Sequence, residues 1–517
     1  MTDDRTQNAV ESADETAATA ASAAAEDAAA AGAATEDAEE EPPIKGRKNG
    51  LNPVLSDELV TVMKSGWADT ELRDLVPDEQ APYAAKRRAA LSARFPGDRL
   101  VIPAGRLKTR NNDCDYEFRA SSEYVHLTGD QAEDAVLVLE PRAEGGHDAR
   151  VYLLPRSNRE NGEFWLSGQG ELWVGRRHSL AEAEALLGLP ARDSRAVVDE
   201  LLVAADEHPA TTRLLRSHDA RLESALAEHT TRHGDEELRV FLSELRLVKD
   251  DWEVGQLQAA TDATAIGFTD VVRELTQAVA SSERWIEGTF NRRARVEGNG
   301  VGYSSICAAG PHATTLHWIR NDGAVRPGEL LLLDAGVETR TLYTADVTRT
   351  LPINGRFTDL QRTIYDAVYD AQQAGIAAVR PGARFRDFHE AAQQVLAERL
   401  VEWGLVEGPA ERVLELALQR RWTLHGTGHM LGLDVHDCAH ARTEAYVDCV
   451  LEPGMVLTVE PGLYFQADDL TVPEEYRGIG VRIEDDILVT VDGNRNLSAA
   501  LPRSSAEVEA WMADLRG

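Results

Sequence analysis

Residues 329–352 read ELLLLDAGVETRTLYTADVTRTLP. The four leucines form an apolar run of the length of a buried strand, and the run leads directly to Asp334. A second strand is predicted at 344–352, with Asp346 as a possible cross-strand neighbour of Asp334 in a hairpin. A buried carboxylate without a partner is costly, so both side chains require a partner or a metal ion.

The same arrangement recurs later in the chain. Apolar strands are predicted at 456–464 and 480–491, where Glu460 follows Leu-Thr-Val and Glu484 follows Val-Arg-Ile. Helical patterns at 359–379 and 385–403 lie between the two strand pairs. Two hairpin-like pairs flanked by helices predict an α+β domain with an internally duplicated sheet.

A smaller α/β domain is predicted before this one. Its helices are expected at 84–95, 180–187 and 213–229, and its strands at 99–104, 135–140 and 150–154. A long amphipathic helix at 250–280 then opens the second domain. We therefore expect a tail at 1–48, an amino-terminal domain at 49–246 and a catalytic domain at 247–517.

The tail consists mostly of Ala, Glu, Asp and Thr, and this composition predicts disorder because it cannot bury enough apolar surface. Over 517 residues the formal net charge is -34, which argues against nucleic acid or an anionic membrane as a partner. Four scattered cysteines are interpreted as packing residues of a reduced protein. With no signal-peptide or membrane-spanning pattern, a cytoplasmic location is expected.

Three histidines stand among glycines in residues 424–437, LHGTGHMLGLDVHD. Gly426 and Gly428 disfavour a helix there, so a loop or strand is expected. One imidazole, from His429, and four carboxylates make a hard, oxygen-rich set that suits Mn²⁺ or another octahedral divalent ion. Four negative charges call for two ions, which can activate a shared water and polarise a carbonyl together.

Taken singly, each of these side chains is more often a solvated turn residue or half of a salt bridge. Taken with their neighbours, they resemble the pita-bread (creatinase/aminopeptidase) metallopeptidase family and, within it, aminopeptidase P, the Xaa-Pro aminopeptidases. The matching segments occur in family order at 334–336, 346–350, 425–437, 460–464 and 480–486, and a weaker match at 116–119 and 124–129 covers the amino-terminal domain.

The resemblance implies hydrolysis of the first bond of peptides with proline at the second position, by a hydroxide bridging two divalent metals, most simply Mn²⁺. It implies that Asp334 binds one metal, that Asp346 and Glu484 bridge the two, and that His429 and Glu460 bind the other. Family members are commonly dimers or tetramers, so a homo-oligomer is expected.

The resemblance also assigns the remaining site residues. His317 is expected on the substrate side, and His436 is expected to steady the tetrahedral intermediate. His425, Tyr464 and Tyr303 are assigned to substrate binding, with His425 lining the proline pocket. Arg482 is expected to hold Glu484 or Asp346, and Glu460 to pass a proton to the leaving nitrogen.

Alternatives remain. Prolidase, which cuts Xaa-Pro dipeptides, would share the ligands. Methionine aminopeptidases usually lack the amino-terminal domain, creatine hydrolysis needs no metal, and non-catalytic relatives generally lose ligands. One departure from the bacterial enzymes is a hairpin one residue longer between Asp334 and Asp346, which predicts a bulge or a longer loop at 338–343.

Overall fold

The structure is a computed structural model that describes residues 56–112, 114–207 and 210–516. The predicted disordered tail at 1–48 lies outside these residues. The chain divides into two compact units, one of residues 1–70 and 156–177 and the other of residues 71–155 and 178–517.

The described residues of the first unit, 56–70 and 156–177, form three short helices, α2 (Asp57–Met63), α5 (Glu163–Leu166) and α6 (Glu171–Val174). The Ser56 side chain caps α2 by accepting the Leu59 N–H. The Trp67 ring meets Phe164 edge-on with centroids 5.3 Å apart, so aromatic contacts hold this small unit together.

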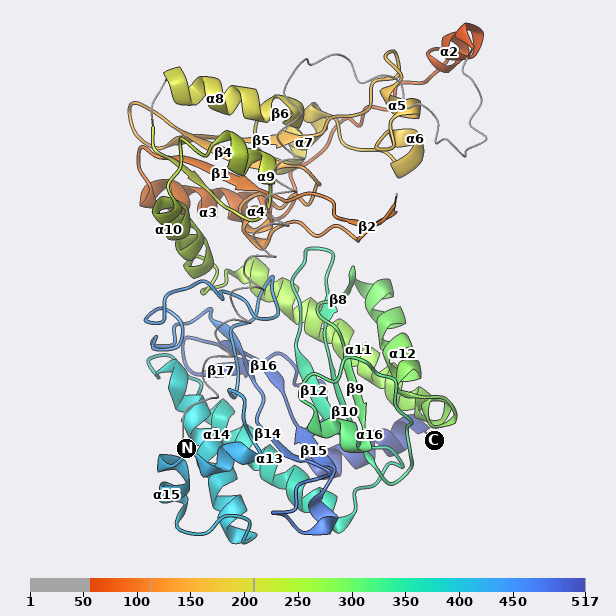
Figure 1. Ribbon diagram of the computed structural model, residues 1–517, viewed down its shortest axis with the longest axis vertical. Coiled ribbons are helices and arrows are strands. Elements are labelled where there is room, and N and C mark those ends of the chain that lie inside the picture. Colours follow the sequence, from red (N-terminus) through yellow and green to blue (C-terminus); the bar gives the residue numbers. More distant parts are fainter. Residues whose placement is uncertain (1–55, 113, 208–209, 517) are drawn as a thin grey trace, which may run out of the picture. The chain divides into compact units, whose positions relative to one another are not determined.

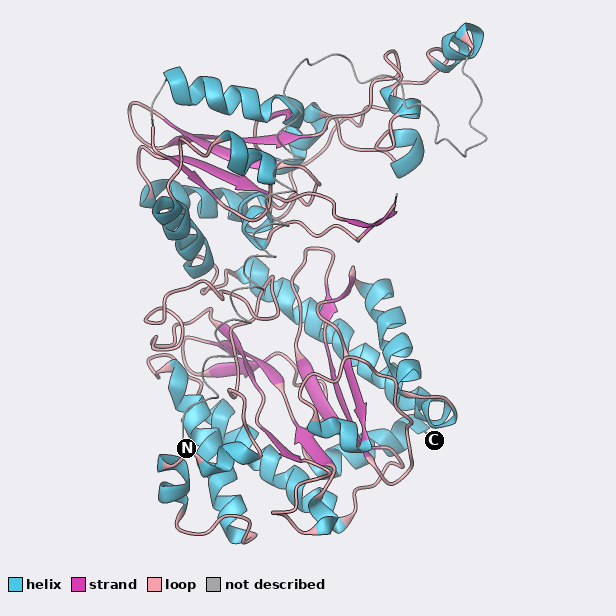
Figure 2. Cartoon of the chain, viewed as in Figure 1, coloured by secondary structure: helices cyan, strands magenta, loops and turns pink. Residues whose placement is uncertain are grey.

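The second unit begins with a five-stranded sheet in the order β6-β5-β4-β1-β7. Its strands are β1 (Arg99–Pro103), β4 (Val136–Pro141), β5 (His147–Leu153), β6 (Ala191–Asp193) and β7 (Thr212–Leu214). Its helices are α3 (Ala81–Arg94), α4 (Ser122–Thr128), α7 (Leu180–Leu187), α8 (Val197–Glu207), α9 (Ala220–Ala225) and α10 (Arg232–Glu244), with the short β2 (Thr109–Asn111), β3 (Cys114–Asp115) and η1 (Ser194–Ala196). The predicted α/β character of this region is confirmed (Figure 2).

Of the helix predicted at 213–229, only residues 220–225 are an α-helix, α9, and the rest of the prediction is wrong. The segment starts as β7, which pairs in parallel with β1. It then turns at Ser217, whose φ is +78°, before α9 begins behind the Asp219 cap. Pairing of buried Leu214 with the sheet outweighs the helical periodicity of the segment, since tertiary contacts override a weak local preference.

The carboxyl-terminal part consists of two successive halves, each with helices followed by strands (Figure 1). The first half has α11 (Asp251–Ala280) and α12 (Glu283–Glu297), followed by β8 (Gly300–Val301), β9 (Ile306–Ala309), η2 (Gly310–Thr314), β10 (Leu330–Ala335), β11 (Val337–Glu338) and β12 (Val347–Pro352). The second has α13 (Asp359–Ala378), α14 (Phe385–Glu402), α15 (Ala410–Glu415) and η3 (Leu418–Arg421), followed by β13 (Val456–Val459), β14 (Gly462–Phe465), η4 (Glu474–Tyr476), β15 (Ile479–Arg482), β16 (Asp485–Val489) and β17 (Asn494–Asn496). The chain ends in α16 (Ser505–Arg516). The predicted duplication is therefore present.

The predicted strands at 456–464 and 480–491 are each divided in two. Glu460 and Pro461 separate β13 from β14, and Ile483 and Glu484 separate β15 from β16. The divided strands join different sheets, because β13 pairs with β16 while β14 pairs with β15. Sequence periodicity does not reveal that the chain passes from one sheet to another at these positions, since both parts of each predicted strand are apolar.

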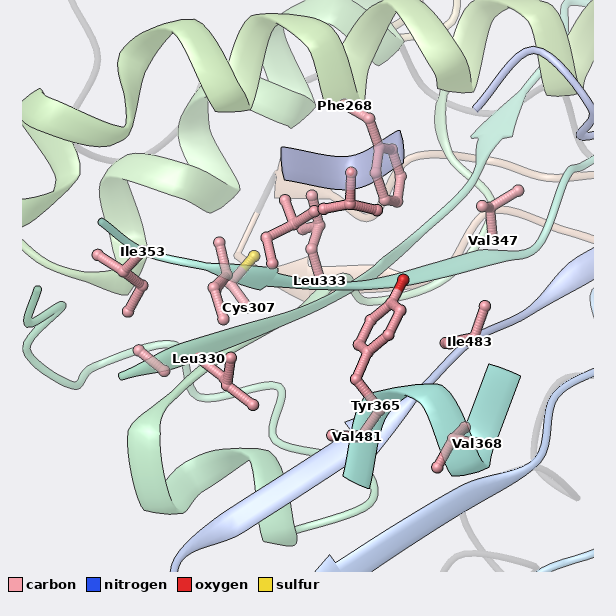
Figure 3. Close-up of a cluster of buried hydrophobic side chains, with 14 of the residues drawn as sticks. Phe268, Cys307, Leu330, Leu333, Val347, Ile353, Tyr365, Val368, Val481 and Ile483 are labelled. Atoms are coloured by element: carbon pink, nitrogen blue, oxygen red, sulfur yellow. The ribbon is translucent and has the colours of Figure 1, made fainter. Parts of the chain in front are cut away.

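The two halves meet where β12 runs beside the break between β15 and β16. Glu484 N–H donates to the Thr348 carbonyl at 3.1 Å, and Thr350 Oγ1 donates to the Arg482 carbonyl at 2.9 Å. One hydrophobic core spans the junction: Figure 3 shows Leu333 and Val347 of the first half with Val481 and Ile483 of the second. The breaks at Glu460 and Glu484 are therefore carried on a rigid, shared core.

Two further sequence predictions concern membrane-spanning helices and the cysteines. Between residues 56 and 516, as far as they are described, no helix combines the length and apolarity that a membrane crossing requires. All four cysteines are free thiols, and Cys307, Cys438 and Cys449 are buried as predicted. Cys114 is exposed, so its assignment as a packing residue is wrong: β3 lies in an exposed two-stranded ribbon.

Candidate metal centre and active site

A cavity of about 390 Å³ opens in the carboxyl-terminal part of the chain. Every predicted site residue except Tyr464 lines it: Tyr303, His317, Asp334, Asp346, His425, His429, His436, Glu460, Arg482 and Glu484. Its apolar lining comes from four residues that the sequence analysis does not identify, Ile306, Leu316, Ile319 and Val435. Segments more than 180 residues apart in sequence thus converge on one concave surface.

Asp334 and Asp346 are brought together by the hairpin, but not as direct cross-strand partners. In the β10–β12 register Asp334 stands opposite Thr348, and Asp346 lies two residues before Thr348. Since side chains alternate along a strand, Asp346 projects on the same face as a diagonal neighbour of Asp334. Gly336 permits this close approach, because a Cβ there would lie 1.7 Å from the Ala345 carbonyl oxygen.

Glu460 and Glu484 lie at the two strand breaks of the second half. Buried Arg349 holds the second break: its Nη1 donates to the Glu484 carbonyl at 2.6 Å, and its Nη2 pairs with Asp485 at 2.7 Å. At the first break Pro461 has no N–H to donate to a ladder. Both breaks turn the acidic side chains toward the cavity rather than into a sheet.

His429 comes from the glycine-containing loop, which is a loop as predicted. The loop runs alongside β13. The His429 N–H donates to Thr458 Oγ1 at 3.1 Å, and the Thr458 N–H donates to the His429 carbonyl at 2.9 Å. His429 Nε2 lies 3.3 Å from Asp346 Oδ2 and 3.6 Å from Glu460 Oε1. Ligand atoms of Asp346, His429 and Glu484 all lie within 4.8 Å of one another.

Tyr303 and Arg482 bind the carboxylates of the site directly. The Tyr303 hydroxyl lies 2.6 Å from both Asp334 Oδ1 and Asp346 Oδ1. Tyr303, which is predicted to bind substrate, therefore also contacts two side chains that are predicted to bind metal. Arg482 was predicted to hold Glu484 or Asp346. Instead its Nη2 forms an ion pair with Asp334, and it reaches Glu484 only through another side chain, Thr348.

Thr348 lies in the segment 346–350 that matches the family, but no role is predicted for it from the sequence. Its Oγ1 accepts from Arg482 Nε at 3.2 Å and donates to Glu484 Oε2 at 2.7 Å. Its position two residues after Asp346, on the same strand face, is the signal that could have identified it.

Asp486 was likewise left without a role. It is fully buried, and its Oδ2 accepts the Asp346 N–H at 3.2 Å.

The histidines are distributed around these carboxylates. His425 Nε2 contacts the Tyr464 hydroxyl at 2.8 Å, and the same hydroxyl accepts from Arg482 Nη1 at 3.0 Å. Tyr464 therefore lies behind the cavity wall. The His436 ring stands edge-on to His429 with centroids 4.3 Å apart, and His317 and His436 are both exposed within the cavity lining.

Electrostatics show an excess of negative charge. Burial, together with Asp346, Glu460 and Asp334, raises the pKa of Glu484 well above its usual range. Burial, with Asp346 and Asp334, also raises the pKa of Glu460 to about 7, although His429 and Arg482 oppose the rise.

His429 balances part of this charge. Burial disfavours its charged form, but Asp346 and Glu460 raise the pKa of His429 to about 9. Burial likewise opposes ionisation of Asp346, yet contact with His429 keeps the pKa of Asp346 below its ordinary value. Arg482 and a protonated His429 do not offset four clustered carboxylates. The donor set therefore fits divalent cations with oxygen and imidazole ligands.

Comparison with known proteins agrees with this chemistry. The family model described as metallopeptidase family M24 matches residues 255–491, and that of the aminopeptidase P N-terminal domain matches residues 84–208. Xaa-Pro aminopeptidase 1 of Streptomyces coelicolor is 73% identical over 479 residues, which cover 93% of this chain and 96% of the relative. The Escherichia coli Xaa-Pro aminopeptidase is 32% identical over 84% of this chain and 98% of its own length.

Solved structures give the same result. Pseudomonas aeruginosa aminopeptidase PepP has a TM-score of 0.74 at 30% identity, covering 85% of this chain and 99% of that one. Aminopeptidase P from E. coli with the inhibitor Pro-Leu has a TM-score of 0.74 at 29% identity, covering 85% and 99%.

The chain belongs to metallopeptidase family M24. Its carboxyl-terminal domain has the pita-bread fold of that family and follows an aminopeptidase P amino-terminal domain. Within the family it is a metallo-aminopeptidase of the aminopeptidase P type.

Proposed function

We propose that this enzyme hydrolyses the bond between the first residue of a peptide and a proline at the second position, using two divalent metal ions. The observation that carries the proposal is the convergence of Asp334, Asp346, His429, Glu460 and Glu484 on one cavity. The 73% identity to a Streptomyces Xaa-Pro aminopeptidase supports the substrate class.

These five side chains would hold the ions, with Asp346 and Glu484 between the two. When bound, such ions would lower the pKa of a water and polarise the scissile carbonyl. The chain's own residues complete the site. His436 would steady the carbonyl oxygen as it gains charge, and Glu460 would pass a proton to the proline nitrogen.

The substrate would occupy the part of the cavity that is lined by apolar side chains. Ile306, Leu316, Ile319 and Val435 offer surface for an uncharged side chain and exclude water. His425 and Tyr303 would line the substrate side of the cavity, Arg482 would hold Asp334, and Tyr464 would support His425 and Arg482 from behind the wall.

Several finer points belong to the same proposal. We infer Mn²⁺ as the metal from the hard donor set, a homo-oligomeric dimer or tetramer, and a cytoplasmic location. Peptides are proposed as partners, and nucleic acid and membranes are not. Residues 49–246 and 247–517 are proposed as the two domains.

Replacing Asp346 tests the metal centre. Asp346→Ala removes a carboxylate that contacts both Tyr303 and His429, so metal content and cleavage of an Xaa-Pro tripeptide should both be lost. Metal analysis of the purified protein, coupled to the tripeptide assay, gives the result. Full activity without the second metal would refute the two-ion mechanism.

Peptide length separates the two proline-specific activities. An Xaa-Pro dipeptide and an Xaa-Pro tripeptide are offered at equal concentration to the Mn²⁺-loaded enzyme. We expect the tripeptide to be cleaved faster. Cleavage of the dipeptide alone would identify a prolidase instead.

A further inference from the structure

We propose that Glu283 and Asn321, two buried side chains outside the cavity, are positioning residues that place His317 opposite the metal-ligating carboxylates. The inference rests on the proposed role of His317 at the substrate side. His317 lies in the segment between η2 and β10, which also supplies Leu316 and Ile319 to the cavity lining. This segment has no regular secondary structure between residues 315 and 327 apart from turns.

Glu283, the first residue of α12, joins this segment to the end of β9 and to η2, which precede it. Its Oε1 accepts the Ala309 N–H at 2.8 Å and lies 2.8 Å from His312 Nδ1. Its Oε2 accepts the Trp318 indole N–H at 2.8 Å and the Gly323 N–H at 2.7 Å. The Glu283 N–H also donates to the Gly323 carbonyl at 2.9 Å. One carboxylate with 0% exposure therefore joins four residues between 309 and 323 to the start of α12.

Asn321 provides the second anchor. Its Oδ1 accepts the Cys307 N–H at 2.9 Å, and its Nδ2 donates to the Ser305 carbonyl at 2.9 Å. These bonds attach the segment to the edge of β9 beside Ile306, another cavity-lining residue. Asn321 is 0% exposed and has a φ of +47°, a conformation that asparagine tolerates better than most residues.

Glu283 acts on His317 through its neighbour Trp318, and Asn321 holds the same segment against β9. Trp318 is tied to Glu283 and stacks on the His312 ring with centroids 3.8 Å apart. His317 lines the cavity. The Ile319 N–H donates to the His317 carbonyl at 3.0 Å, which closes a tight turn at this point. The imidazole position thus depends on where Trp318 is held, and burial makes each anchor bond costly to lose.

Trp318→Phe tests this with the smallest change, since it removes one indole N–H and keeps an aromatic ring. Trp285→Phe is the matched control: Trp285 lies on the same helix as Glu283 and donates an indole N–H to Glu274 at 2.9 Å. With an Xaa-Pro tripeptide and Mn²⁺-loaded enzyme, we expect kcat/KM to fall roughly tenfold for Trp318→Phe, because a misplacement of about 1 Å can cost about 100-fold. Trp285→Phe should leave kcat/KM unchanged.

Asn321→Gly is an independent second variant. Glycine keeps the positive φ available but removes both side-chain hydrogen bonds to β9. We expect a similar loss of kcat/KM with two metal ions still bound, which metal analysis checks. A loss of metal in this variant would show that Asn321 supports the centre itself and would overturn its assignment to His317.

A double-mutant cycle with His317→Ala separates positioning from general support of the fold. If Trp318 acts through His317, Trp318→Phe should cause no further loss of kcat/KM in the His317→Ala background. A full additional loss would make Trp318 and its anchor merely structural and overturn the inference. Should His317→Ala alone leave kcat unchanged, the proposed role of His317 fails as well, whereas metal-dependent Xaa-Pro cleavage would stand.

Discussion

Thr348 is the residue that links the positive and negative sides of the site. Its hydroxyl accepts from Arg482 and donates to Glu484, so it orients a predicted ligand without being one. Such outer contacts commonly tune metal affinity by about 10- to 100-fold. The side chain is fully buried, which leaves no water to take the place of its hydroxyl.

Thr348→Val tests this contact with a side chain of nearly the same shape. We expect Mn²⁺ affinity to fall by about tenfold or more, measured by titration against a competing chelator dye. Thr269→Val is the control, since the Thr269 hydroxyl bonds only the Ala265 carbonyl within α11. Equal affinities of the two variants would contradict the role of Thr348.

At the scale of elements, the loop at 424–437 and β13 approach each other closely at a glycine. A Cβ on Gly428 would lie 2.0 Å from the Thr458 carbonyl oxygen, whereas a Cβ on Gly426 would meet its nearest atom at 4.0 Å. The loop carries His425, His429 and His436, so the close approach at Gly428 determines how far His429 reaches into the site.

Gly428→Ala should push the loop away from β13 and move His429 off the carboxylates. We expect loss of bound metal together with loss of tripeptide cleavage, because the imidazole no longer meets Asp346 and Glu460. Gly426→Ala, two residues away, should retain its metal. Metal analysis of both proteins decides the matter, and normal metal content in Gly428→Ala would show that the loop tolerates the shift.

The position of the acidic strand ends could be predicted from sequence, but their pairing could not. The run Leu330 to Asp334 indicates a buried strand with a charge at its end. The transfer of the chain between sheets at Glu460 and Glu484 depends on Arg349 and on pairing between β14 and β15. The Arg349 contact joins residues 135 positions apart, and the partners of the β14–β15 pairing are separated by a loop, so no local pattern records either of them.

At the scale of the whole molecule, the hairpin that carries Asp334 and Asp346 reaches the core of the amino-terminal sheet domain. The loop at 338–343, for which the sequence predicts a bulge or extra length, is closed by the Thr339 N–H on the Tyr343 carbonyl at 2.8 Å. Leu342 and Tyr343 are buried in a cluster that includes residues of α3, α4 and β1. The Tyr343 hydroxyl donates to Glu253 at 2.8 Å.

Glu253 makes this junction sensitive to acid. Burial opposes its ionisation, but His126 and Arg87 depress the pKa of Glu253 far below its ordinary value. A depressed carboxyl pKa contributes stability above the pKa of the unfolded chain, about 4.3, and this stability is lost as the pH falls further. Burial also lowers the pKa of His126, so the unfolded chain binds that proton first, below about pH 6.5.

Both groups therefore favour the unfolded state on acidification. We expect the midpoint of thermal unfolding to fall from pH 7 toward pH 3, and Glu253→Gln to weaken the part of that fall that lies below about pH 4.3, where the stability contributed by ionised Glu253 is lost. Exposed Glu398→Gln serves as the control. Parallel pH profiles for the wild type and Glu253→Gln would rule out this contribution.

Periodicity and composition were sufficient to predict the duplicated α+β fold, the amino-terminal domain, and the acidic strand ends with His429, whereas the roles of His317, His425 and His436 came from the family resemblance. Those properties depend on residues that are close in sequence, because a strand or a helix repeats its apolar positions at its own characteristic spacing. The division of two strands between sheets, the attachment of Arg482 to Asp334, and the anchoring of the His317 segment by Glu283 depended on folding. Each joins residues distant in sequence, and burial selects such pairs because a charge or amide removed from water must find a partner wherever the packed chain supplies one.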